Sequence, residues 1–271
     1  MTRHPTFVHL TDLHLSHPDL NDPHLRADTV AALALAVETI GRIDPRPDFV
    51  ILGGDLTNRG EPESYRLLRE MTEGLGLPLV HALGNHDSRP AFYREVLGED
   101  RDGPCCHDRV IAGLHVIVLD TSVPGRVGGA IGADQFAFLR AALDRAPGLP
   151  KIVVAHHPPR LDDGGLVWEA LGPGDTGELA ETLRGRGVAG IFCGHIHMNR
   201  VDHWHGTPLI VTGGLHATVD VLLRSGMRIL EGTGFGLCVL RPSGLGVTFV
   251  PLTPHPRLLG EISEDRLRSF T

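Results

Sequence analysis

The sequence predicts an α/β sandwich, and three features of the 271-residue chain indicate it. Short apolar runs rich in β-branched residues alternate with longer segments that carry Ala and Leu at helical spacing. The short runs are bounded by Gly, Pro or Asp, which commonly end strands. Two last runs with alternating apolar residues surround a Pro-Ser-Gly turn, which indicates a β-hairpin. Such an alternation of elements is typical of sheets covered by helices.

The strands are expected to be buried, because their residues are apolar without a polar face. They are residues 6–10, 48–53, 77–83, 114–120, 151–157, 188–194 and 207–214, followed by the hairpin 235–252. The helices between them are expected at residues 27–43, 61–75, 91–97, 133–146 and 176–185. Residues 158–177 are expected to be a long loop punctuated by Gly and Pro, either a lid or a simple insertion.

No internal repeat and no long linker divides the chain. We therefore expect one domain over residues 1–254 and a C-terminal tail over residues 255–271. Whether the tail makes a homodimer stays open.

Composition excludes several partners. The formal net charge of -8 argues against a nucleic-acid polymer, which would call for a basic surface. No apolar run approaches the roughly 20 residues that cross a bilayer, so no membrane is expected. The N-terminus has His4, Pro5 and His9 in place of an apolar signal segment, and the four cysteines lack framework spacing. The sequence therefore predicts a cytoplasmic protein with reduced thiols.

Five of the expected strands end in clusters of metal-capable side chains. The clusters are Asp12-Leu13-His14, Gly54-Asp55, Gly84-Asn85-His86-Asp87, His156-His157 and Gly194-His195-Ile196-His197. Ligand sites of open α/β sheets form beyond the carboxyl ends of strands, so these segments are expected to converge. In extended chain, residues two apart point to the same side, so Leu13 and Ile196 are expected to face the core.

The order of these residues resembles that of the calcineurin-like metallophosphoesterases over almost the whole chain. Within that superfamily the segments around residues 53–68, 118–125 and 155–159 most resemble the bacterial class III cyclic nucleotide phosphodiesterases, with the glycerophosphodiesterases close by. The resemblance implies a four-layer αββα sandwich of two mixed sheets flanked by helices, with two metals at one edge.

The resemblance also implies a ligand set. The first metal would take Asp12, His14 and His197, the second Asn85, His156 and His195, and Asp55 would bridge both. Imidazole, carboxylate and amide ligands suit two divalent ions of manganese, iron or zinc. Two such metals lower the pKa of a shared water, and the resulting hydroxide is expected to attack phosphorus.

The catalytic residues are expected to be Asp55 and His86, and substrate is expected to contact Asn85, His86 and His197. His86 has no metal in this set, so it is expected to donate a hydrogen bond or proton to the leaving group. Asp87 is expected either to orient His86 or this loop or, by residue type, to cap the helix that follows.

Two further histidines lie near these segments in the sequence. His157 is expected to serve the site from behind a ligand, to form a turn or to touch substrate. His216 is expected to be a pocket-wall residue because it follows a strand end.

The function expected is hydrolysis of a 3',5'-cyclic nucleotide such as cAMP or cGMP to the nucleoside monophosphate. The alternatives are a glycerophosphodiesterase, a 2',3'-cyclic nucleotide phosphodiesterase or a phosphomonoesterase on the same site, and a non-catalytic scaffold. A pocket built by residues 158–177 and 213–230 would separate them, because a slot for a flat base favours the nucleotide and a small polar pocket favours glycerol.

Overall fold

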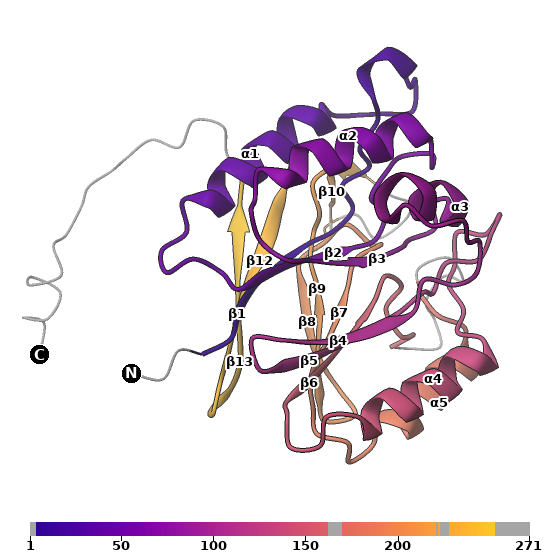
Figure 1. Cartoon of the computed structure of the whole chain (residues 1–271), viewed down its shortest axis with the longest axis vertical. Helices are drawn as coiled ribbons and strands as arrows, with labels where there is room; N and C mark the ends of the chain where they lie inside the picture. The colour runs from indigo at the N-terminus through magenta and orange to yellow at the C-terminus, as the bar shows by residue number, and fades with distance from the viewer. Residues whose placement is uncertain (1–3, 162–169, 221, 223–227, 253–271) are drawn as a thin grey trace, which may run out of the picture.

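The computed structural model describes residues 4–161, 170–220, 222 and 228–252. Two mixed sheets lie face to face, with helices on the outer side of each (Figure 1). The expected sandwich of two mixed sheets flanked by helices is therefore confirmed. Among the described residues, no helix has the length and apolar character that crossing a bilayer requires.

The first sheet has five strands in the order β13-β12-β1-β2-β3. Their bounds are Thr6–Leu10 for β1, Phe49–Gly53 for β2, Leu79–Ala82 for β3, Gly234–Arg241 for β12 and Gly244–Pro251 for β13. β1, β2 and β3 are parallel, and the hairpin β12–β13 adds to β1 in the antiparallel sense. The three parallel strands therefore end at the same edge.

The second sheet has six strands in the order β4-β5-β6-β7-β9-β8. Their bounds are His107–Ile111 for β4, Leu114–Leu119 for β5, Lys151–Ala155 for β6, Val188–Cys193 for β7, Arg200–Trp204 for β8 and Thr207–Val211 for β9. The four inner strands are parallel, and β4 and β8 close the two edges in the antiparallel sense. A separate two-stranded sheet pairs β10, Thr218–Val219, with β11, Ile229–Leu230.

The helices begin and end close to the expected residues. Their bounds are Pro18–Leu20 for η1, Thr29–Gly41 for α1, Pro62–Glu73 for α2, Arg89–Phe92 for α3, Tyr93–Leu97 for the π-helical η2, Ala133–Asp144 for α4 and Pro173–Leu183 for α5. Asp28 caps α1 by accepting a hydrogen bond from the Ala31 amide. The expected boundary at residue 176 was wrong, because Pro173 starts α5 three residues earlier. Of the expected loop, residues 162–169 lie outside the described residues.

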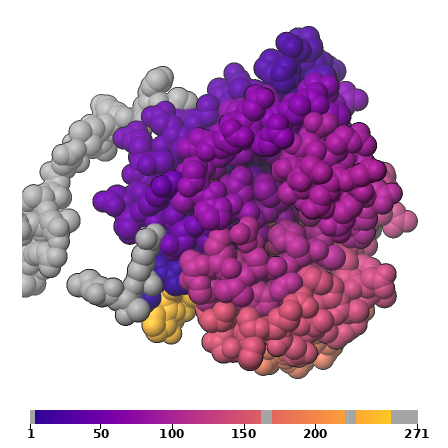
Figure 2. Space-filling model, viewed as in Figure 1, coloured from indigo at the N-terminus to yellow at the C-terminus, as the bar shows by residue number. Residues whose placement is uncertain are grey.

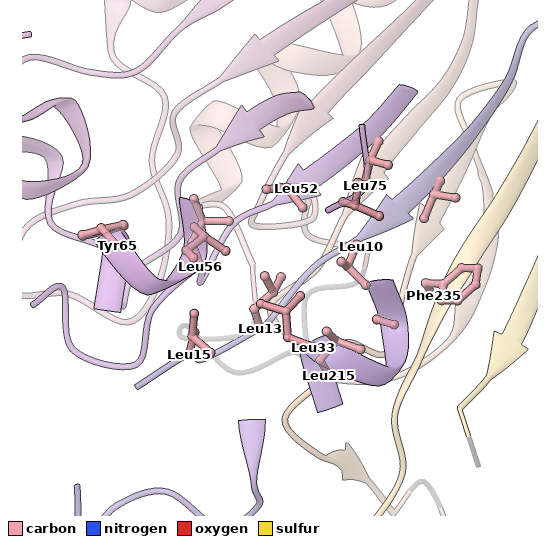
Figure 3. Close-up of a cluster of buried hydrophobic side chains, with 14 of the residues drawn as sticks. Leu10, Leu13, Leu15, Leu33, Leu52, Leu56, Tyr65, Leu75, Leu215 and Phe235 are labelled. Carbon is pink, nitrogen blue, oxygen red and sulfur yellow. The ribbon is translucent and has the colours of Figure 1, made fainter. Parts of the chain in front are cut away.

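Three apolar layers hold the sandwich together. One lies between the first sheet and α1 and α2, where Leu10, Leu33 and Leu52 meet (Figure 3). A second lies between the sheets, where the ring of Phe7 stacks on that of Phe49 with centroids 5.0 Å apart. A third lies between the second sheet and α4 and α5. Strands buried on both faces need the continuous apolar runs that the sequence contains.

In Figure 2 the N-terminal part of the chain, coloured indigo to purple, lies directly against the following part, coloured magenta to pink. In Figure 1 the first sheet lies on the side of α1 and α2 and the second on the side of α4 and α5. Segments that follow strands of both sheets can therefore build one site.

Candidate metal centre

The predicted ligands that follow β1, β2, β6 and β7 come together at one edge of the sandwich. Nε2 of His156 lies 3.2 Å from Oδ2 of Asp55, and Nε2 of His14 lies 3.6 Å from the same oxygen. Nε2 of His197 lies 3.4 Å from Oδ1 of Asp12. One carboxylate therefore lies between imidazoles from two sheets, which is where a bridging ligand has to lie.

The donors form two neighbouring groups around Asp55. Nε2 of His14 lies 3.1 Å from Nε2 of His197 on one side. On the other side the rings of His156 and His195 lie with centroids 5.3 Å apart. Donor atoms of Asp12, Asp55 and His156 also lie within 4.8 Å of one another. Imidazole nitrogens and carboxylate oxygens that lie this close together can bind a shared cation. Imidazoles that share neither a proton nor a cation gain nothing from such proximity.

Two buried donor atoms of this cluster have no hydrogen-bond partner in the described structure. They are Oδ1 of Asn85 and Nε2 of His156, whose 3.2 Å contact with Oδ2 of Asp55 is an ion pair without hydrogen-bond geometry. A buried polar atom without a partner costs about 1–3 kcal/mol, so such atoms usually have a function. Both belong to the predicted second ligand set, and a cation would satisfy both. The donor set therefore fits a metal.

The pKa shifts of the clustered side chains also favour a bound cation. Burial lowers the pKa of His156, but the carboxylates of Asp55 and Asp12 outweigh burial and raise it to about 9. Burial would raise the pKa of Asp55, but the neighbouring imidazoles hold it well below its usual range. Burial lowers the pKa of His14 well below its usual range, which keeps that ring neutral. The site thus holds Asp55 as an ionised carboxylate, which favours a positive charge beside it.

The imidazoles are oriented by hydrogen bonds at the opposite ring nitrogen. Nδ1 of His156 donates to the carbonyl of Gly53 at 3.0 Å, and Nδ1 of His197 donates to that of Ala217 at 3.1 Å. Nδ1 of His14 lies 3.0 Å from the side-chain oxygen Oδ1 of Asn58. In each ring the Nδ1 contact leaves Nε2 free to face the centre, which is how proteins orient metal-binding histidines.

Asn58 is a residue that sequence reasoning missed. Besides holding His14, its amide nitrogen donates to Oδ2 of the buried Asp22 at 2.7 Å. Its backbone carbonyl accepts from Nδ1 of His86 at 2.7 Å. Its position three residues after Asp55 was the only available signal.

The ligand segments are also bonded to one another through the backbone. The His195 amide donates to both carboxylate oxygens of Asp12, at 2.9 and 3.1 Å. The His86 amide donates to Oδ1 of Asp55 at 2.9 Å. Glycines let the segments approach: a Cβ on Gly84 would lie 2.2 Å from Oδ1 of Asp55.

The backbone of the predicted ligands is not extended, so the expected reason for their orientation was wrong. Five of the nine non-glycine residues with positive φ in the described structure are predicted ligands: Asp12, His14, Asp55, His195 and His197. Leu13 and Ile196 are nevertheless buried in the core, as expected, and Figure 3 shows Leu13 within the first apolar cluster. In these segments residues with left-handed backbone alternate with core residues. Each left-handed residue thereby directs its ligand side chain toward the centre of the cluster.

His86 and Asp87 have separate tasks. The ring of His86 is exposed and lies edge-on to that of His14, with centroids 4.6 Å apart. The carboxylate of Asp87 accepts from the amides of Leu56 and Gly84 and from the hydroxyl of Tyr65. The helix-capping alternative for Asp87 was wrong: it joins the segments after β2 and β3. Burial, together with the charge of Asp55, raises its pKa to about 6.

His157 and His216 lie on opposite sides of the cluster. Both ring nitrogens of the buried His157 are used, by the Thr121 hydroxyl at 2.7 Å and the Val127 carbonyl at 2.9 Å. His157 therefore supports the site from behind. His216 lines the cavity with its ring centroid 4.8 Å from that of His14, so the pocket-wall prediction is confirmed.

A cavity of about 520 Å³ opens over the cluster. This volume is within the usual range for small-molecule sites. The cavity is lined by His14, Asp55, Asn85, His86, His195 and His197, with Arg59 and His24 beside them. Residues 217–219 and 229 form part of its wall, as expected of the segment 213–230. No described residue of the segment 158–177 lines it.

Comparison with known proteins agrees with this geometry. Residues 5–199 match the model of the calcineurin-like phosphoesterase family. A "cAMP/cGMP dual specificity phosphodiesterase" of Mycobacterium tuberculosis is 34% identical over 255 residues, covering 90% of this chain and 79% of the relative. "Glycerophosphodiester phosphodiesterase GpdQ" of Enterobacter lignolyticus is 30% identical over 195 residues, covering 66% of this chain and 69% of the relative.

A solved structure shares the fold. It is a dimetal phosphatase from Danio rerio, which aligns with a TM-score of 0.62 and 16% sequence identity over 93% of this chain and 99% of its own. The extent of the family match and the identity to the mycobacterial relative lead to one conclusion: the chain belongs to the calcineurin-like phosphoesterase family.

Proposed function

We propose that the protein is a dimetal phosphodiesterase that hydrolyses a 3',5'-cyclic nucleotide to the nucleoside monophosphate. The observation that carries the proposal is the position of Asp55 between imidazoles of both sheets, at 3.2 and 3.6 Å. The buried Oδ1 of Asn85, which has no hydrogen-bond partner among the described residues, supports it. The mycobacterial relative's name supports the substrate class.

The residues that would hold the cations are those of the predicted set. Asp12, His14 and His197 would hold the first, Asn85, His156 and His195 the second, and Asp55 would belong to both. Mn, Fe or Zn suits these nitrogen and oxygen donors. When bound, the two cations would activate a water molecule and neutralise charge on the phosphate.

His86 would donate a proton to the leaving oxygen. Its Nδ1–H is held by the Asn58 carbonyl at 2.7 Å, so Nε2 faces the cavity. From this position Nε2 would give a proton to the departing ribose oxygen. Asn85 and His197 lie beside it and would contact the phosphate.

The test compares two variants with elemental analysis and turnover. Asp55→Ala is expected to lose both metals and activity. His86→Ala is expected to keep its metals and to lower kcat roughly 10²–10⁴-fold, the range for loss of a general acid. His205→Ala, an exposed histidine outside the cavity, is the control. Loss of metal from His86→Ala would refute its assigned role.

A second candidate is hydrolysis of a glycerophosphodiester, which the 30% identical relative supports. Catalytic efficiencies on 3',5'-cyclic, 2',3'-cyclic, glycerophospho and monoester substrates distinguish the two. No turnover of any of them with added Mn would instead favour a scaffold. The cytoplasmic location, the boundary at residue 254 and a homodimer stay predictions.

A further inference from the structure

Part of the lining of the metal cavity is aliphatic. It consists of Val127, Val219 and Ile229, which line the same cavity as His14 and Asp55. Val219 and Ile229 are directly opposite each other in the β10–β11 pair. Val127 comes from the loop between β5 and α4 and is 54% exposed, and Ile229 is 42% exposed. We call these three residues the aliphatic wall.

The loop that carries Val127 is fixed from the metal centre. The Val127 carbonyl accepts from Nε2 of His157 at 2.9 Å, and the hydroxyl of Thr121, where the loop begins, contacts Nδ1 at 2.7 Å. The backbone of Gly129 approaches the same ring closely, since a Cβ there would lie 2.4 Å from Cγ of His157. His157 follows the predicted ligand His156, so the loop that carries Val127 is held in one frame with the metal centre.

We propose that the aliphatic wall binds the base of the nucleotide whose phosphate lies over the metal centre. The inference rests on the proposed function and names the specificity-determining residues of that site. Large aliphatic side chains left half exposed inside a cavity gain free energy only from an apolar ligand surface. The wall shares the cavity with the phosphate site, so it has to meet the part of the substrate that is attached to the phosphate.

Substrate chemistry separates the candidates at this wall. A nucleobase presents a flat face with little polarity that aliphatic side chains can cover. Glycerol presents hydroxyl groups, and the wall offers them no donor or acceptor side chain. The wall therefore favours nucleotides over base-free diesters by its contacts with the base.

The test uses Val127→Ala and Ile229→Ala, with Val201→Ala as the matched control. Val201 is 56% exposed on β8 and does not line the cavity. Each wall variant is expected to raise KM for cAMP about 3- to 10-fold with kcat unchanged, because truncation removes contacts made equally in the ground and transition states. KM for glycerophosphoethanolamine, which has no base, is expected to stay unchanged, as are all values of the control.

A second measurement does not depend on turnover. Adenosine, which carries the base without a phosphate, is expected to bind metal-depleted wild-type protein and to bind both wall variants more weakly by NMR titration. Equal changes for cAMP and the base-free diester, or adenosine binding unaffected in both variants, would overturn the proposal. If wild type does not hydrolyse cAMP, the proposed function fails, and the adenosine titration still decides whether the wall binds a base.

Discussion

Asn58→Ala is expected to weaken one of two metal-binding events without removing the acid that serves the leaving group. The substitution removes the 3.0 Å contact that orients His14 and the 2.7 Å hydrogen bond to Asp22. It keeps the backbone carbonyl that holds His86. Two buried side-chain hydrogen bonds, one of them to a carboxylate, amount to roughly 2–4 kcal/mol of stability.

The effect on metal is a separate quantity. Loss of a partner that orients a ligating histidine usually costs 10- to 100-fold in metal affinity. We therefore expect calorimetric titration of metal-depleted Asn58→Ala with Mn to show one event weakened by about that factor. At saturating Mn, kcat is expected to fall less than about 10-fold, because His86 is still held.

Gln135→Ala is the matched control for this experiment. Gln135 is also a buried amide with two hydrogen bonds, to the backbone nitrogen and oxygen of Asp120, and it lies outside the cavity. Urea denaturation should show a similar loss of stability in both variants, and only Asn58→Ala should lose metal affinity. If both bind Mn as wild type does, Asn58 has no role in orienting His14.

Two other substitutions test the packing of the site and the pH dependence of the fold. Gly84→Ala would place a Cβ 2.2 Å from Oδ1 and 2.6 Å from the backbone nitrogen of Asp55, so we expect loss of metal and a lower unfolding midpoint. Gly132→Ala is the control, because its Cβ meets nothing within 4 Å and should change neither quantity. Burial, with the charges of His107 and Arg109, lowers the pKa of His81 to about 4. The unfolded chain binds that proton more tightly, so stability is full above pH 6.5 and falls by roughly 3 kcal/mol as the pH drops to 4. In His81→Gln, urea midpoints across this range should lose that part of the slope, and an unchanged slope would contradict the assignment.

Much of the fold could be predicted because the inner strands are buried on both faces. A strand such as β2, whose five residues are all buried, has a continuous apolar run that is easy to recognise. The edge strands β4 and β8 were missed because Asp, Arg and His residues interrupt their apolar runs and few of their residues are buried. Their place in the sheet depends on a neighbour far away in the sequence, which local patterns do not reveal.

The predicted ligands could be found because each follows such a run, but their supports could not. Asp87 has a residue type that caps helices, and the same carboxylate can equally bind amides of another loop, as it does with Leu56. Asn58 carries no distinguishing pattern, since its partners His14 and Asp22 are chosen by the fold. Pro173 did indicate the start of α5. The prediction instead followed the spacing of the apolar residues and placed the start at residue 176.

The left-handed backbone at five predicted ligands has a consequence for engineering. Each such residue stores about 1–3 kcal/mol of conformational strain, and glycine would relieve it. Glycine at the partly exposed His197 should therefore relieve backbone strain in the apoprotein while destroying the metal site. Screens that select only for heat resistance would drift toward inert variants at this position, and selection for turnover has to accompany them.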